Sequence, residues 1–408
     1  MIINPFRTFL ASAACAAGCL LATVPARAGN TVGDVFYIDM ENHNFTQPGS
    51  QSSPNQIFGN AAAPYQNSLI TAGNANAAQT SWTSNYHNVA PGVHPSLPNY
   101  LWQEAGTNGT IFNDNQPFGT GGANQGSTPN LSALLQNAGV PWKSYQEDTN
   151  TDAAGNVLPQ SQWTVPLLNR SGSYTTVPNA YNGSLQYNFA TKHDGQLYYD
   201  ATNGGNNATT SNPEIPHYAP LQQLAADLTN NTVGRYNLIT PNQFNDSHTA
   251  LNTDFTYAGQ TWAHNTDQNA IAVGDNFLSI LVPQIMASQA YRNNGAIVIW
   301  WDETEGGDDR SRTLEEIVIS PLAKGNAYLS TLDYTHSSDL KTMQELFNVR
   351  APGGGFLGDA NTPGTNDLSD LFQPGALNAV PEPSSVLTVA IGLVGAIAFR
   401  RRFAAKSA

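Results

Sequence analysis

The segment GAIVIWWDETEGG, residues 295–307, indicates the class of fold. Its centre, residues 297–301, is apolar at every position, whereas a strand with one face in water alternates apolar and polar residues. An uninterrupted apolar run is expected for a strand that is covered on both faces. The run ends at the acidic pair Asp302 and Glu303. The segment therefore predicts a buried strand with two carboxylates at its carboxyl end.

Three further segments have the same pattern of an apolar run followed by polar residues: VGDVFYIDMEN at 32–42, RYNLITPNQFND at 235–246 and EEIVISPLAKG at 315–325. Helical patterns lie between the predicted strands, at 96–105, 128–139, 218–230, 274–288 and 337–348. Alternation of strands and helices predicts an α/β fold around a mostly parallel sheet. The stretch 150–215 is rich in Gly, Asn, Thr and Pro, so we expect a loop-rich insertion that forms part of a pocket rim.

Polar side chains of catalytic type follow these strands. Ligands of open α/β sheets bind outside the carboxyl ends of the strands. The residues at these strand ends are Glu41 and Asn42, Asp246 and His248, Asp302 and Glu303, and His336 just before a helix. They predict a functional site at that edge of the sheet.

The segment VHPSLPNYLWQEAG, residues 93–106, places Ser96 between two prolines and ahead of an apolar run. One interpretation is a helix start, because Ser is a favoured N-cap and Pro is tolerated in the first helical turn. The other interpretation is a nucleophile, because a helix N-terminus favours a phosphate anion beside the hydroxyl. Both roles are compatible with the pattern.

The N-terminus has the pattern of a secretory signal peptide, residues 1–28. Arg7 precedes the apolar stretch 9–24, and Ala26-Arg27-Ala28 forms a cleavage site. Both cysteines, Cys15 and Cys19, lie in this segment. We therefore expect an exported chain without disulfides, without a catalytic cysteine and without a cysteine zinc site.

The C-terminal segment 381–408 has an apolar run at 386–399 followed by Arg400, Arg401 and Arg402. The run is short for a bilayer span, and the arginines would hold this end on the cytoplasmic side. Together with the preceding VPEP it resembles the PEP-CTERM sorting tail of Gram-negative bacteria, and the alternative is a simple C-terminal anchor. The resemblance implies export and sorting machinery that acts on the tail. We expect the domain at 29–380 in the periplasm, at the outer surface or in the extracellular matrix, with transient membrane anchoring by the tail.

The charge of the chain limits its partners. Sixteen Lys and Arg face 30 Asp and Glu, for a formal net charge of −14. Such a surface repels nucleic acid over long range, so no nucleic-acid partner is expected. An anionic substrate would need a local positive centre, and a metal ion supplies one.

Eight blocks in order carry a resemblance to a known family: VFYIDMENHNF, HPSLPNYLWQEAG, VPWKSYQED, KHDG, ITPNQFNDSHT, GDNFLSILVPQI, IVIWWDE and THSSDLKTMQELF. They resemble the bacterial phosphoesterase family of acid phosphatases and non-haemolytic phospholipases C, over roughly residues 32–348. This family belongs to the alkaline-phosphatase-like superfamily. The resemblance implies a three-layer α/β sandwich with a mostly parallel central sheet.

The resemblance also implies roles for residues. One divalent metal ion would be held by oxygen ligands, which suit Mg²⁺, Ca²⁺ or Mn²⁺ better than Zn²⁺. Ser96 would attack phosphorus, and Asn99 would donate to a phosphoryl oxygen, as the Asn does in the Thr-Phe-Pro-Asn of the related nucleotide pyrophosphatase/phosphodiesterases. The predicted metal ligands are Glu41, Asn42, Ser96, Asp302 and Glu303; His248 and His336 are predicted to transfer protons, and His193 and Asp246 to bind substrate. His43, His87 and His94 are given no role.

Two departures from the superfamily pattern limit the number of metal ions and the class of substrate that we expect. Asp302-Glu303 replaces an Asp-His pair, and Asp246-Ser-His248 is spaced differently from Asp-x-x-x-His, so a second metal is not expected. Asn99-Tyr100 replaces the arginine pattern of sulfatases.

The expected function is a secreted, metal-dependent phosphomonoesterase of the acid phosphatase type, acting on a phosphate ester through a phosphoserine. The alternatives are a phospholipase C or other phosphodiesterase, and a non-catalytic surface- or matrix-binding protein on the same fold.

Overall fold

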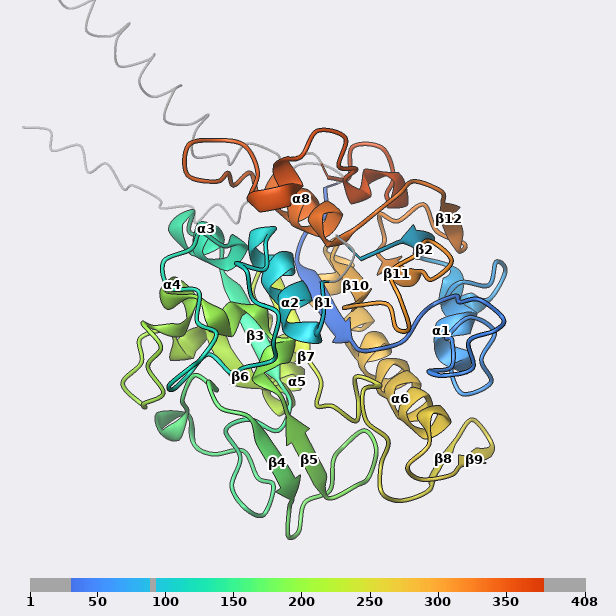
Figure 1. The fold of residues 1–408 in the computed structure, drawn as a ribbon, viewed down its shortest axis with the longest axis horizontal. Coiled ribbons are helices and arrows are strands. Elements are labelled where there is room, and N and C mark those ends of the chain that lie inside the picture. Colours follow the sequence, from blue (N-terminus) through green and yellow to red (C-terminus); the bar gives the residue numbers. More distant parts are fainter. Residues whose placement is uncertain (1–30, 89–92, 378–408) are drawn as a thin grey trace, which may run out of the picture. The chain divides into compact units, whose positions relative to one another are not determined.

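A central eight-stranded sheet organises the protein (Figure 1), of which the computed structural model describes residues 31–88 and 93–377. Pairing registers show that β11 is antiparallel to both of its neighbours and that every other pair is parallel. The predicted α/β fold with a mostly parallel sheet is confirmed. The strand order is β12 (Tyr328–Ser330), β2 (Thr80–Tyr86), β11 (Leu314–Ile319), β10 (Ala296–Trp301), β1 (Val35–Met40), β7 (Tyr236–Thr240), β3 (Trp142–Gln146) and β6 (Tyr218–Pro220).

Helices cover both faces of this sheet. Successive side chains of a strand point to opposite faces. On one face of β1, Tyr37 donates a hydrogen bond to Asp339 of α8 (2.9 Å). On the other face, Met40 packs against Gly274 of α6. The structure therefore has three layers, with α2 (Ser96–Ala105), α3 (Leu131–Asn137), α4 (Asp200–Asn203) and α8 (His336–Leu346) grouped together, and α1 (Pro64–Leu69), α5 (Leu224–Asn230), α6 (Asp267–Met286) and α7 (Gln289–Arg292) forming the other group.

All four predicted strands are present, as β1, β7, β10 and β11, and every residue of each is buried. This burial explains their predominantly apolar sequences, although Asp39, Asn237, Glu315 and Glu316 are buried as well. The sequence analysis did not identify β2, β3, β6 or β12. In β2, the polar residues Thr80, Ser81 and Thr83 are buried between β11 and β12, so hydrophobicity did not mark the strand.

The helix expected at 218–230 is wrong at its start. Residues 218–220 form β6, and the α-helix begins only at Leu224. Pro220 ends β6, which is an edge strand, and an edge strand tolerates proline because no further strand needs its missing N–H.

The predicted insertion contains a hairpin, β4 (Arg170–Ser173) and β5 (Gln186–Phe189), which lies outside the central sheet (Figure 1). Residues 191–203 of this insertion form short helical turns, and most of their side chains are buried. This segment packs directly beneath α2: a Cβ added at Gly195 would lie 2.2 Å from the backbone oxygen of Tyr100. A second hairpin, β8 (Phe255–Tyr257) and β9 (Gln260–Trp262), precedes α6.

The predicted signal peptide, 1–28, and the sorting segment, 381–408, lie outside the described residues. Within the described part of the chain, no helix has the length and apolar character that a bilayer span requires.

Candidate active site

Three adjacent strands deliver the predicted acidic residues to one edge of the sheet. β10, β1 and β7 are neighbours and parallel, so their carboxyl ends lie side by side. Glu41 follows β1 directly, and its N–H donates to the backbone oxygen of Asp246 (2.9 Å). Asp302 follows β10, and its N–H donates to the oxygen of Met40 (3.3 Å). Backbone hydrogen bonds thus bring the three loops together beyond the sheet.

Ser96 is the first residue of α2, and Pro95 occupies the N-cap position. The expectation that Ser96 caps the helix is wrong. Its Oγ lies 3.1 Å from Glu41 Oε2 and 3.3 Å from Glu303 Oε1. The cap is supplied from a distant loop, because Asp114 Oδ1 accepts a hydrogen bond from the N–H of Leu97 (3.1 Å). The hydroxyl of Ser96 therefore does not cap the helix and lies between two carboxylates.

Glu41 is a completely buried hub of the site. While Oε2 faces Ser96, Oε1 accepts a hydrogen bond from the Tyr100 hydroxyl (2.8 Å) and lies 2.9 Å from His193 Nε2. Burial would raise the pKa of Glu41, but the neighbouring His193 and Lys192 hold it well below its usual value. Glu41 is therefore the ionised carboxylate of the site.

His193 lies between two carboxylates. Its Nδ1 is 3.0 Å from Asp246 Oδ2, and its ring centroid lies 5.6 Å from that of His248. Burial lowers the pKa of His193, yet Glu41 and Asp246 raise it to about 9. Burial also lowers the pKa of His248, whose Nδ1 contacts Thr249 Oγ1 at 2.9 Å. Ligand atoms of Glu41, His193 and His248 lie within 4.8 Å of one another.

The acidic pair after β10 completes the other side of the site. The N–H of Asn42 donates to Asp302 Oδ1 (3.1 Å), and Asn42 adopts a left-handed backbone with φ of 57°. Glu303 accepts from His94 Nδ1 and from Asn99 Nδ2 (3.4 Å). Burial and the charges of Glu41 and Glu303 raise the pKa of Asp302 well above its usual value.

These residues fit a hard divalent cation. Within the described residues, Asn42 Oδ1 and Asp302 Oδ2 are buried oxygens that have no hydrogen-bond partner. Buried polar atoms are normally paired, so both oxygens indicate a missing ligand. Glu41, Asp302 and Glu303 repel one another, and a cation between them would relieve that repulsion. The predicted donor set consists of oxygen atoms, which Mg²⁺, Ca²⁺ and Mn²⁺ prefer.

Of the remaining predicted residues, Asn99 lies at the site and His336 lies behind it. Asn99 lies within α2, with Nδ2 bound to the oxygen of Val93 (3.1 Å) and to Glu303, so it belongs to the site. His336 is fully buried behind the site, where its Nδ1 contacts the Tyr86 hydroxyl (2.7 Å) and its Nε2 contacts the backbone oxygen of Asp302. Burial lowers the pKa of His336 to about 3. No contact joins His336 to Ser96.

Of the histidines without a predicted role, His94 lies at the site. Its Nδ1 contacts Glu303, its Nε2 lies 2.8 Å from Asp308 Oδ1, and its side chain is 35% exposed. His43 points away, because Nε2 contacts Asp267 (3.0 Å) and Nδ1 contacts the backbone oxygen of Glu41 (3.0 Å). His87 contacts the backbone oxygen of Arg312 through Nδ1 (3.3 Å).

Lys192 is the site residue that sequence reasoning missed. Its Nζ lies 3.2 Å from Ser96 Oγ and 3.1 Å from Asp114 Oδ2. Burial lowers its pKa, but Glu41 and Asp114 raise it by more, so the side chain is an ammonium. The available signal was its position beside His193 in the block KHDG.

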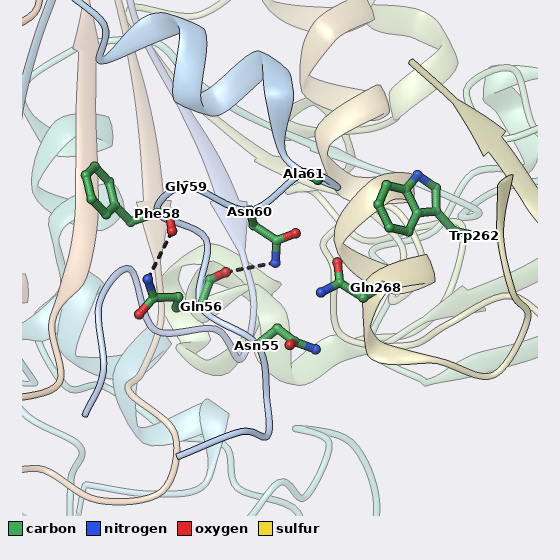
Figure 2. A pocket seen from close by; sticks show the side chains of 8 residues that line it. All are labelled: Asn55, Gln56, Phe58, Gly59, Asn60, Ala61, Trp262 and Gln268. Atoms are coloured by element: carbon green, nitrogen blue, oxygen red, sulfur yellow. Dashed lines mark hydrogen bonds between the residues drawn. The ribbon is translucent and has the colours of Figure 1, made fainter. Parts of the chain in front are cut away.

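A separate hollow of about 340 Å³ lies between the segment before α1 and the start of α6 (Figure 2). Half of the residues that line it carry side-chain amides, and none is a predicted site residue. It connects to the site only indirectly, because Asn55 donates to Asp267 (2.7 Å), which contacts His43. The lining residues are Asn55, Gln56, Phe58, Gly59, Asn60, Ala61, Trp262 and Gln268.

Comparison with solved structures finds similar proteins whose sequence identity to this chain is low. A protein in the alkaline phosphatase superfamily from Vibrio parahaemolyticus is 12% identical, with a TM-score of 0.45 over 86% of this chain and 72% of that chain. Ps i-CgsB is 11% identical, with a TM-score of 0.41 over 82% and 75%. The lipoteichoic acid synthase LtaP from Listeria monocytogenes is 9% identical, with a TM-score of 0.40 over 80% and 74%. No curated protein matches the sequence.

Family models match both parts of the chain. Residues 379–402 match the PEP-CTERM protein-sorting motif, which indicates export and surface sorting. Residues 33–350 match the model of the phosphoesterase family, and this range contains every residue of the site described above. The chain therefore belongs to the phosphoesterase family, and the reaction class of that family is the hydrolysis of phosphoesters.

Proposed function

We propose that this protein is an exported, metal-dependent phosphomonoesterase of the acid phosphatase type that acts through a phosphoserine at Ser96. The observation that carries the proposal is the position of the Ser96 hydroxyl. It lies at the start of α2, between the carboxylates of Glu41 and Glu303, and within 3.2 Å of an ammonium group. Each neighbour has the chemistry that an attacking hydroxyl and an anionic phosphoryl group require.

The metal-binding residues in this proposal are Glu41, Asn42, Ser96, Asp302 and Glu303. The partnerless oxygens of Asn42 and Asp302 support this assignment. A bound divalent cation supplies two effects, a lower pKa for the Ser96 hydroxyl and neutralisation of charge on the phosphoryl oxygens.

Side chains of the site are assigned to the attack on phosphorus, to proton transfer and to binding of a phosphoryl oxygen. Ser96 Oγ attacks phosphorus, and its proton passes to Glu41 or Glu303, the two carboxylates within hydrogen-bonding distance. Asn99, with Nδ2 directed at this cluster, is assigned to a phosphoryl oxygen. His248 is assigned to the proton of the alcohol that leaves.

His193, Asp246 and His336 are assigned to binding and positioning. His193 and Asp246 form a buried pair that orients Glu41 and faces His248. His336 acts at a distance, since it contacts the backbone oxygen of Asp302 and not Ser96. We assign it to holding the acidic pair in place.

The test measures hydrolysis of p-nitrophenyl phosphate, bis-p-nitrophenyl phosphate, p-nitrophenylphosphorylcholine and p-nitrophenyl sulfate by the full chain, with and without EDTA, beside Ser96→Ala. We expect the monoester to be the best substrate, with turnover lost in EDTA and in the variant. Preference for a diester would assign a phosphodiesterase or phospholipase C instead. No turnover from pH 4 to pH 9 with any of several metals would favour a binding protein on this fold.

Export is part of the proposal. The sorting motif at 379–402 supports it, and the signal-peptide pattern at 1–28 agrees with it. Fractionation of cells that express the full chain should place phosphatase activity in the periplasm, at the cell surface or in the medium. Activity confined to the cytoplasmic fraction would contradict this part of the proposal.

A further inference from the structure

Lys192 contacts the hydroxyl of the proposed nucleophile, Ser96. It belongs to a short 3-10 helix, Thr191–His193, in the segment that packs beneath α2. Its side chain is only 14% exposed, and Nζ lies 3.2 Å from Ser96 Oγ. A lysine held this deeply beside a hydroxyl is costly unless its charge is used or paired.

Asp114 fixes the position of this ammonium group. One carboxylate oxygen, Oδ2, lies 3.1 Å from Lys192 Nζ, and the other, Oδ1, accepts the N–H of Leu97 at the start of α2 (3.1 Å). The same carboxylate therefore binds both the lysine and the helix end that carries Ser96. This arrangement sets the position of Nζ relative to Ser96 Oγ independently of the acidic pair.

Hydrogen-bond accounting assigns a direction to each contact of Ser96 Oγ. A serine hydroxyl has one proton and two lone pairs. Ionised Glu41 and Glu303 can only accept, so the proton is directed to one of them. Lys192 can only donate, so its N–H must point at one lone pair of Oγ. The second lone pair would face the proposed metal ion, and transfer of the proton to the carboxylate frees a third for attack on phosphorus.

We propose that Lys192 is a catalytic residue that stabilises negative charge on Ser96 Oγ, both when the phosphoserine forms and when it breaks down. This inference rests on the proposed function. In the first step the Oγ–P bond forms and the bond from phosphorus to the alcohol oxygen breaks. The proton of Ser96 passes to a carboxylate, and the alcohol takes a proton from His248.

In the second step a water oxygen bonds to phosphorus, the P–Oγ bond breaks, and Oγ recovers its proton from the carboxylate. The proton lost by the water returns to His248. Lys192 keeps all of its protons throughout. Charge on Oγ is greatest when Oγ is the leaving group, so hydrolysis of the phosphoserine depends most on Lys192.

The experiment compares the full chain with its Lys192→Met, Lys192→Arg and Lys324→Met variants in rapid-quench turnover of p-nitrophenyl phosphate. Lys324 is the matched control, since it pairs with Asp370 in a different part of the fold. For Lys192→Met we expect kcat to fall on the order of 100-fold, with a burst of p-nitrophenol. Phosphoserine at Ser96 should accumulate in the quenched protein, as mass spectrometry of the Ser96 peptide can detect.

Lys192→Arg should recover part of kcat and lose the burst, which excludes a folding defect as the cause, and Lys324→Met should match the parent. The inference is overturned if kcat of Lys192→Met stays within threefold of the parent, or falls without accumulation of phosphoserine. A parent chain that hydrolyses no phosphate ester would instead contradict the proposed function.

Discussion

Ser96 lies one position inside α2, and this position decides what its hydroxyl can do. An N-cap serine turns its Oγ toward the backbone N–H groups of the first helical turn. Here Pro95 takes the N-cap position and Asp114 accepts the exposed N–H of Leu97. The hydroxyl of Ser96 is left to Glu41, Glu303 and the lysine ammonium. A residue 18 positions further along the chain thus releases the serine for chemistry.

At the scale of the single residue, Glu303→Gln tests the role of the acidic pair. The change keeps the shape of the side chain but removes a negative charge beside Ser96 and a proposed metal ligand. We expect kcat/KM for p-nitrophenyl phosphate to fall by roughly 10²–10⁴, because metal binding and proton acceptance are both weakened. Metal content, measured by mass spectrometry of the purified protein, should fall as well.

Glu305→Gln provides the matched control, since Glu305 contributes its backbone oxygen, and not its carboxylate, to the hydrogen bonds with Asn44 and Gln51. This variant should stay within about twofold of the parent. Equal activity of the Glu303 and Glu305 variants would argue against the proposed site.

Among the helices, α2 and α3 are joined by a buried carboxylate. Glu104, near the end of α2, accepts hydrogen bonds from the N–H of Ser132 (2.9 Å) and from its hydroxyl (3.0 Å). Ser132 lies in the first turn of α3, where unpaired N–H groups favour a negative side chain. Burial nevertheless raises the pKa of Glu104 to about 7. The contact between the two helices is therefore sensitive to pH.

The sign of this dependence follows from the proton balance. An unfolded glutamate has a pKa of about 4.3, so between that value and about 7 the folded state holds a proton that the unfolded chain lacks. The contribution of Glu104 to stability is greatest below pH ~4 and is lost as pH rises through the folded pKa. Glu104→Gln removes this titration.

We expect the free energy of unfolding of Glu104→Gln, relative to the parent, to increase by roughly 2–4 kcal/mol from pH 4 to pH 8. Urea denaturation at a series of pH values measures it. A pH-independent difference for Glu104→Gln would contradict the raised pKa.

The contact of α6 with the loop after β7 is a second element-scale feature. A Cβ added at Gly274 would lie 2.0 Å from Ser247 Oγ and 3.1 Å from the terminal carbon of Met40. Ser247 stands between Asp246 and His248, so the absence of a side chain at Gly274 lets this loop approach α6. The glycine is required for close packing and not for an unusual φ.

Gly274→Ala should lower the free energy of unfolding by about 1–3 kcal/mol and reduce kcat/KM, because the loop that carries His248 must move. The double variant Gly274→Ala/Ser247→Ala should recover part of both losses, since it removes the closest contact. Thermal unfolding and steady-state kinetics measure the two effects. Gly49→Ala is the control, because no atom lies within 4 Å of its Cβ position. Failure of the double variant to recover stability would show that the Ser247 contact is not the cause.

For the molecule as a whole, the dominant electrostatic feature is the concentration of carboxylates at the sheet edge of a chain with net charge −14. Burial and the charge of Glu41 raise the pKa values of Asp302 and Glu303, whereas His193 and Lys192 hold the pKa of Glu41 low. A bound divalent ion offsets this repulsion only in the folded state. Metal binding and stability are therefore expected to be linked.

Removal of metal with EDTA should lower the Tm of the full chain, and re-addition of Mg²⁺, Ca²⁺ or Mn²⁺ should restore it. An ion at 100 times its Kd stabilises the fold by about 2.7 kcal/mol. Differential scanning fluorimetry measures the shift without any need for activity. Asp302→Asn should show a smaller response than the parent. A Tm that responds to no metal in the parent would contradict a cation at this cluster.

Much of the candidate site could be predicted because it follows from strand ends. Glu41 and the Asp302–Glu303 pair directly follow predominantly apolar runs, and parallel neighbours bring such ends together. Lys192 offered no such signal, because it lies in a segment without hydrophobic periodicity. The burial of His336 could not be predicted either, since its partners Tyr86 and Asp302 come from β2 and from the loop after β10.

The amino-acid sequence was sufficient for the class of fold, the family and the carboxylates at the strand ends, because each depends on local patterns along the chain. Only the tertiary structure showed that β11 runs antiparallel, that Asp114 caps α2 and that Lys192 reaches Ser96. These features join segments that are far apart in sequence, and their energies come from burial and pairing of polar groups. Local propensity carries no information about which distant partner will satisfy a buried charge or an exposed N–H.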